Sequence, residues 1–192
     1  EDALADGEHS VASGASSYAA GTESVAVGYG AFALDDNSLA VGALSSAFGV
    51  GSSAIGSLAQ TNADYATATG YGASASGNNS AAYGAGAQAS GAGSVAVGGM
   101  ATQDDGSALL TDANGDPIEF ASTSAGMGGT AVGASAQAAG LASSALGVGA
   151  EADGDLSTAV GGLAYAAGEQ SLAGGFQAAA VGDGAVALGA TS

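Results

Sequence analysis

The chain repeats one short phrase every fourteen residues. Ser24-Val25-Ala26-Val27-Gly28 returns as Ser38-Leu39-Ala40-Val41-Gly42. The glycine that closes the phrase marks the period at positions 14, 28, 42, 56, 70, 84 and 98, and again at 133, 147, 161, 175 and 189. A period of this length is shorter than a domain and close to one coil of a solenoid. The repeat therefore predicts one continuous solenoid of about twelve coils.

Each period holds two stretches of alternating residues, which predict two short strands per coil. The second stretch follows the marker glycine, as in Ala73-x-Ala75-x-Gly77. Alternation places successive side chains on opposite faces of a strand. In both stretches one of these sets consists of Ser, Ala and Gly. Residues this small suit two sheets lying closer than the roughly 10 Å of ordinary sheet packing. We expect an all-β coil that is flattened around a small-residue interior.

The other set in the first strand is mostly large and apolar: the residue before the marker glycine is large and apolar in nine of twelve coils, and the residue two earlier in six, with Thr or Ser in five others. These side chains do not fit an interior of alanine and glycine, and in water they would form a stripe along the solenoid. Burying one large aliphatic side chain contributes about 1.5 to 3 kcal/mol, so we expect the stripe to pack against the same stripe on other copies of the chain. The pattern does not fix the number of copies. The expected assembly core consists of Val25, Val27, Leu39, Val41, Ile55, Val95, Val97, Val132, Leu146, Val160, Val186 and Leu188.

The charged side chains are all acidic, which makes several classes of partner unfavourable. The chain has 18 acidic residues, no Lys and no Arg, and a formal net charge of -18. Nucleic acid and anionic membranes are poor ligands for such a surface. Pairs of acids at expected turns are predicted to solvate the protein. No apolar run approaches the roughly 20 residues of a membrane helix. The first residues lack the pattern of a signal peptide, which leaves open an intracellular protein or a segment of a longer exported chain.

Residues 104–125 interrupt the period, and we expect them to form a β-hairpin inserted between coils. Two short strands, 108–111 and 117–120, flank Asn114-Gly115, a strong hairpin-turn signal. The hairpin would contact a ligand, act as a spacer, or clasp a neighbouring chain through its apolar residues. They are Leu109, Leu110, Ile118 and Phe120.

No cofactor, metal site or catalysis is expected. Asp112, Asn114 and Asp116 place oxygens at alternate positions. A calcium loop that begins at Asp112 would need Gly sixth and Glu twelfth, where this chain has Pro117 and Thr123. His9 is the single histidine, and Cys, Lys and Arg are absent, which leaves few ways to activate a nucleophile.

The phrase resembles the head repeat of trimeric autotransporter adhesins, approximately N-S-V-A-I-G-x-x-S. The closest match is Asn37-Ser38-Leu39-Ala40-Val41-Gly42-Ala43-Leu44-Ser45, whereas Glu23 and Gly93 replace the leading Asn elsewhere. The resemblance implies a left-handed parallel β-roll over 1–192, a homotrimer, and display on the bacterial outer membrane. It also implies attachment to host cells or extracellular matrix, autoagglutination, and a membrane anchor outside this segment. By the family motif, binding would fall on Asn37, Ser38, Leu39, Ala40, Val41, Gly42 and Ser45.

Other interpretations remain open at this stage. A structural spacer or spike of a surface or phage fibre would use the same roll without a ligand. An ice-binding solenoid would need ranks of Thr-x-Thr, and only Thr67-x-Thr69 fits. A calcium β-roll has nine-residue repeats, not fourteen. Four aromatic residues of the second strand would contact a partner or pack between chains: Tyr18, Phe32, Phe48 and Tyr165.

Overall fold

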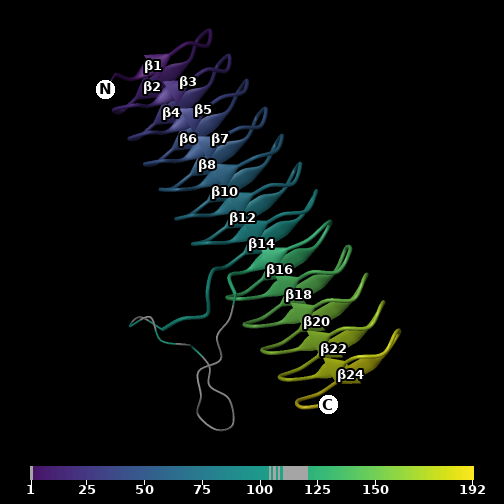
Figure 1. Ribbon diagram of the computed structural model, residues 1–192. Helices are drawn as coiled ribbons and strands as arrows, with labels where there is room; N and C mark the ends of the chain where they lie inside the picture. Colours follow the sequence, from purple (N-terminus) through teal and green to yellow (C-terminus); the bar gives the residue numbers. More distant parts are fainter. Residues whose placement is uncertain (1, 104, 106, 108, 110–120) are drawn as a thin grey trace. The chain divides into compact units, whose positions relative to one another are not determined.

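The computed structural model describes residues 2–103, 105, 107, 109 and 121–192. They form two compact units, Glu1–Ser94 and Val95–Ser192. In each unit short parallel strands stack coil upon coil (Figure 1). The all-β solenoid with two strands per coil is therefore confirmed, while a single continuous head over 1–192 stays a prediction.

The first unit contains two parallel sheets built from alternate strands. Paired residues are fourteen apart in the sequence, as in Val27 with Val41. The odd sheet contains β1 (Leu4–Ala5), β3 (Tyr18–Ala19), β5 (Phe32–Ala33), β7 (Ser46–Ala47), β9 (Gln60–Thr61), β11 (Ser74–Ala75) and β13 (Gln88–Ala89). The even sheet contains β2 (Val11–Ser13), β4 (Val25–Val27), β6 (Leu39–Val41), β8 (Ser53–Ile55), β10 (Thr67–Thr69) and β12 (Ala81–Tyr83).

The second unit repeats this arrangement. Its even strands are β14 (Val95–Val97), β16 (Thr130–Val132), β18 (Ser144–Leu146), β20 (Thr158–Val160), β22 (Leu172–Gly174) and β24 (Val186–Leu188). Its odd strands are β15 (Ser124–Ala125), β17 (Gln137–Ala138), β19 (Glu151–Ala152), β21 (Tyr165–Ala166) and β23 (Ala179–Ala180). Val97 pairs with Val132 across the insertion. The insertion thus interrupts one coil between β14 and β15, and Ser124–Ala125, at the expected end of the insertion, are strand.

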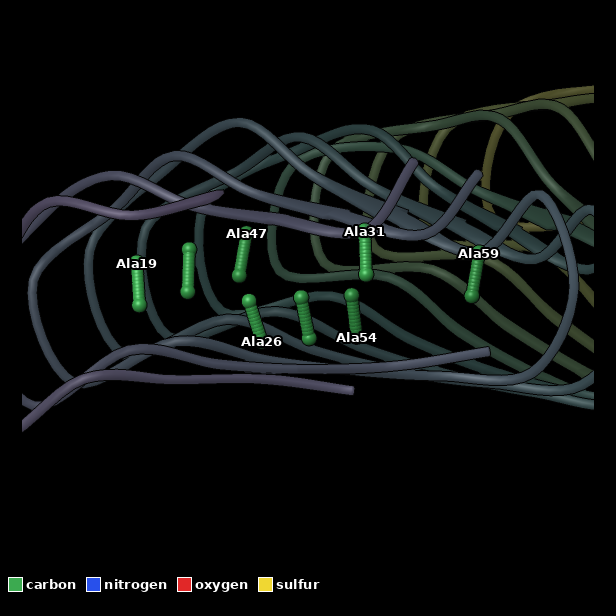
Figure 2. Close-up of a cluster of buried hydrophobic side chains, with 8 residues drawn as sticks. Ala19, Ala26, Ala31, Ala47, Ala54 and Ala59 are labelled. Carbon is green, nitrogen blue, oxygen red and sulfur yellow. The ribbon is translucent and has the colours of Figure 1, made fainter. Parts of the chain in front are cut away.

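The interior is built mainly of alanine, with serine as the next most common residue. Figure 2 shows alanines of the first unit, among them Ala19, Ala26 and Ala54, pointing into the narrow space between two layers of chain. The alanine at the centre of each even strand from β4 to β22 is fully buried. Because a methyl group is the largest side chain that most inward positions hold, the two sheets lie close together, as the alternation predicts.

The turns are stacked by hydrogen bonds as regularly as the strands. The amide of Asn37 donates to the carbonyl of Thr22 at 2.8 Å, and that of Leu44 to Tyr29 at 2.8 Å. Both donors lie in the left-handed region, with φ of 58° and 57°. This conformation recurs at the same two turn positions of most coils, because the stack requires each turn to direct an amide at the coil before it.

The marker glycines stand where no side chain fits. Gly70 has φ of +135°, and a Cβ placed there would lie 2.6 Å from the oxygen and 2.7 Å from the carbonyl carbon of Gly84 in the next coil. Both the backbone conformation and the close approach of two main chains therefore require glycine. This explains why the marker is glycine in all twelve coils.

A column of serines lines the interior beside the even strands, and most of their hydroxyls lack a partner. The Oγ atoms of Ser24, Ser38, Ser80 and Ser94 in the first unit are buried without a hydrogen bond. Ser52 differs, because its Oγ accepts a bond from Thr61 Oγ1 at 2.9 Å. Ala66 occupies the same place one coil before Ser80 and is also fully buried.

We expect Ser80→Ala to leave the free energy of unfolding unchanged or to raise it by about 1 kcal/mol. An unpaired buried hydroxyl carries a desolvation cost of about 1 to 3 kcal/mol, and the alanine at position 66 shows that the site accepts a methyl group. Ser45→Ala is the matched control, because Ser45 Oγ donates to the Gly42 carbonyl at 2.9 Å. The control should lose about 1 kcal/mol. Urea denaturation followed by circular dichroism measures both, and a larger loss at position 80 than at 45 would contradict the interpretation.

Candidate assembly and binding surfaces

The apolar stripe expected from the sequence lies on the outer face of the even strands. In the first unit the ladder aligns Val27 with Val41 and Val41 with Ile55, and Ile55 is 38 % exposed. In the second unit Val132, Leu146 and Val160 stand in the same row, and Val160 is 41 % exposed. The described chain thus leaves a row of at least three large aliphatic side chains accessible in each unit, which ends at Thr69 in the first unit and at Gly174 in the second. Its burial between copies remains a prediction.

The outer face of the odd strands is mostly polar but carries the four aromatic residues singled out above. Ser46, Gln60 and Ser74 succeed one another along the ladder in the first unit. Phe32 precedes Ser46 in the same row, and Phe48 follows β7. Tyr165 stands beside Glu151 in the second unit. These rings do not enter the alanine interior.

The motif residues Asn37 to Ser45 have structural explanations. Ser38, Ala40 and Ser45 are buried, and Gly42, at φ +134°, stacks against the backbone of Gly56. Asn37 occupies the left-handed turn position, which asparagine tolerates better than most residues. Of the seven motif residues proposed to bind, Asn37 is exposed, whereas Leu39, Val41 and Gly42 are partly so. Their binding role stays a prediction.

Acidic residues are segregated to one edge of the roll. Apart from Asp2 and Asp105, every described acid lies on an odd strand or on the turn that follows one. Within the described residues, the turns after the even strands, the insertion aside, contain none. The acids therefore stand away from the apolar stripe, an asymmetry that the sequence shows only once the two turns of each coil are separated.

Several of these acids cap backbone amides of the preceding coil. Asp36 Oδ1 accepts from the Thr22 amide at 2.8 Å and Asp64 Oδ1 from the Val50 amide at 3.0 Å. Asp155 and Asp183 do the same for Leu141 and Glu169. The sequence predicts only a solvating role for these acids. Their recurrence at one turn position, fourteen residues apart or multiples of it within each unit, is the signal for this second role.

Glu151 has a raised pKa, first because it is partly buried on β19 and second because Asp153 lies beside it. A carboxyl whose pKa is higher in the folded protein than in the unfolded chain destabilises the fold once it is ionised. This penalty is absent well below pH 4.5, and it grows as the pH rises from about 4.5 through the folded pKa.

We therefore expect Glu151→Gln to stabilise the fold at pH 7 by a few tenths of a kcal/mol, since solvent screens the exposed part of the group. The gain should vanish near pH 3.5, where both states of the wild type are protonated. Denaturation of wild type and variant at the two pH values measures the difference. A gain of equal size at both would assign the effect to packing rather than to charge.

The base of the insertion is tied to the roll. The carbonyl of Gly99 accepts from the Ser135 amide at 2.8 Å and from Thr123 Oγ1 at 3.0 Å. Ser135 Oγ in turn accepts from the Ala101 amide at 2.8 Å. Leu109 is exposed, and its amide donates to Ala101. The other hairpin residues, Leu110, Ile118 and Phe120, and the turn at 112–116 lie outside the described residues.

The described residues contain no cluster suited to a metal ion. No group of three or more His, Asp or Glu side chains there could hold a metal ion. His9 is exposed, with Nε2 3.8 Å from Glu8 Oε1. The same part of the chain contains no helix of the length and apolarity needed to cross a bilayer.

The YadA head domain repeat matches the chain over 5–31, 19–45, 35–59, 47–73, 75–99, 152–178 and 166–192. Most of these matches overlap a neighbouring match, and together they cover more than half of the 192 residues. The chain belongs to the YadA head family. A comparison with curated proteins finds no match. Membership confirms the resemblance inferred from Asn37 to Ser45 and supports a surface adhesin-type domain of a bacterium, a class that is typically not enzymatic.

Proposed function

We propose that this YadA-type head is a homotrimer on the bacterial outer surface that attaches the cell to host cells or extracellular matrix, without catalysis. The observation that carries the proposal is the apolar row Val27–Val41–Ile55 and its counterpart Val132–Leu146–Val160, which the single chain leaves accessible. At about 25 cal/mol per Å2 of apolar surface, covering such a row strongly favours association. We propose three copies and a left-handed winding by analogy with the family.

The distribution of charge supports this assembly. Three chains would bring together three net charges of -18, which repel one another. The described acids, apart from Asp2 and Asp105, lie on the odd strands and on the turns after them, so the even-strand face that would be shared carries none. The repulsion is then placed at the solvent-facing edge, where water and salt screen it.

Two measurements test the proposal. Sedimentation equilibrium should give three times the 17.3 kDa chain mass, and a monomeric mass at micromolar concentration would refute the trimer. Beads coated with the head should attach to cultured epithelial cells or immobilised matrix proteins, and beads coated with albumin should not.

A ligand-free spacer or spike is the alternative, and one observation favours it. The motif residues Ser38, Ala40, Gly42 and Ser45 are accounted for by packing and turn geometry, so the repeat does not require a ligand. A trimer that fails to attach in the bead assay would support this alternative.

A further inference from the structure

One region of the odd-strand face differs from the rest. Leu4, Tyr18 and Phe32 stand side by side on β1, β3 and β5. Leu34 follows Phe32 by two residues, and Phe48 follows Ser46, the next residue in the row, by two. We call these five residues the N-terminal patch. The next residues in the same row are Ser46, Gln60 and Ser74, so the apolar character ends there.

The patch is accessible in the described chain. Leu4 is 54 % exposed, Phe32 37 % and Phe48 36 %, while Tyr18 and Leu34 are partly buried. It lies on the odd sheet, and the assembly stripe lies on the even sheet across the alanine interior. A partner can therefore contact the patch while the stripe is covered.

Acidic side chains border the patch on one side. They occupy the turns that follow β1, β3 and β5: Asp6, Glu8, Glu23, Asp35 and Asp36. Tyr18 links the patch to these acids, because its hydroxyl donates to Asp6 Oδ2 at 3.4 Å. The chain has no Lys or Arg, so none of these carboxylates is paired with either residue, although Glu8 Oε1 lies 3.8 Å from His9 Nε2.

Aromatic rings next to carboxylates that no Lys or Arg neutralises favour a cationic partner. A cation is attracted to the face of an aromatic ring, and neighbouring carboxylates attract the same cation. Apolar side chains of the partner would cover Leu4, Leu34 and Phe48. We infer that the N-terminal patch docks a polypeptide segment of another protein that presents Lys or Arg side chains beside apolar ones. This inference deepens the proposed adhesive function and rests on it.

Binding of short fluorescein-labelled peptides to the full chain, followed by fluorescence anisotropy, tests this inference. The probe alternates Lys and Leu, and two matched peptides alternate Gln with Leu and Lys with Gln. The patch variant is Phe32→Ser with Phe48→Ser, and the charge variant is Glu23→Gln with Asp35→Asn. Tyr71→Ser is the control, since Tyr71 is a 64 % exposed ring on a turn after an even strand.

The Lys–Leu peptide should bind the wild type and Tyr71→Ser equally, and the patch variant roughly tenfold more weakly. The charge variant should bind several-fold more weakly, with a reduced salt dependence. Both matched peptides should bind less tightly than the probe. Circular dichroism and sedimentation should be unchanged in both variants.

Three results would overturn the inference. The first is no binding of the Lys–Leu peptide to the wild type. The second is equal binding of the Lys–Gln peptide, which would indicate attraction to a polyanion only. The third is a change in sedimenting mass of the patch variant, which would assign the rings to contacts between copies. If the patch variant does not fold, the charge variant and the matched peptides test the inference instead. The wild-type mass tests the trimer separately, so either proposal can fail alone.

Discussion

Alanine in place of Gly70 is expected to lower the free energy of unfolding by roughly 3 to 5 kcal/mol. At φ of +135° a Cβ would lie 2.6 Å from the oxygen of Gly84, so the coils must separate or the chain must abandon this conformation. Separation would break the hydrogen bond from the Gly84 amide to Thr69, now 2.8 Å long. The loss should appear as a lower urea midpoint in circular dichroism.

Gly72 provides a matched control two residues away in the same turn. It has φ of +61°, and a Cβ there would meet nothing within 4 Å. Leu44 and Leu58 occupy the equivalent position in earlier coils. Gly72→Ala should therefore cost only about 1 kcal/mol. Equal losses at 70 and 72 would show that backbone conformation alone, and not the contact between coils, makes the marker glycine necessary.

Ile55→Asp is expected to convert the proposed trimer into monomers. The substitution would bring an ionised carboxylate from each copy into the apolar interface, and burying an unpaired ion costs several kcal/mol. Val41 stands beside Ile55 in the ladder, so the charge would also interrupt the row. Sedimentation velocity at micromolar concentration should show the change in mass.

Gln60→Asp is the control for added charge. Gln60 is exposed on β9, on the odd sheet, so the variant carries the same extra charge on the opposite face. It should sediment as the wild type does. If Ile55→Asp also keeps the wild-type mass, the even-strand stripe is not the assembly surface, and the trimer proposal loses its main support.

The strands and the interior of this fold could be predicted from the sequence because alternation identifies both faces of each strand. The small set, including Ala26 and Ala40, is buried, and the large set, including Ile55, is outside. The stripe could also be predicted, because an isoleucine has no room among alanines. Local pattern is sufficient here, since every coil has the same two neighbours.

The turns and the caps could not be predicted in this way. Leu44 and Tyr65 have φ of 57°, a conformation that their side chains disfavour and that the stacked coils impose. The same holds for Asp36 and Asp64, whose bonds run to amides fourteen residues earlier. The sequence alone gives no sign that a carboxylate on a turn accepts a hydrogen bond from the preceding coil. These features depend on contacts between coils, which composition does not reveal.

The alanine interior has a consequence for how such a molecule can change its reach. Among the described residues, the interior alanines need no particular partner in the coil above or below, because each coil offers its neighbours the same methyl groups and main-chain acceptors. Removing or duplicating a block of fourteen residues within a unit would therefore leave matching surfaces at the junction. Length can then vary through gain or loss of whole layers, while the width of the head and the chemistry of its sides stay the same.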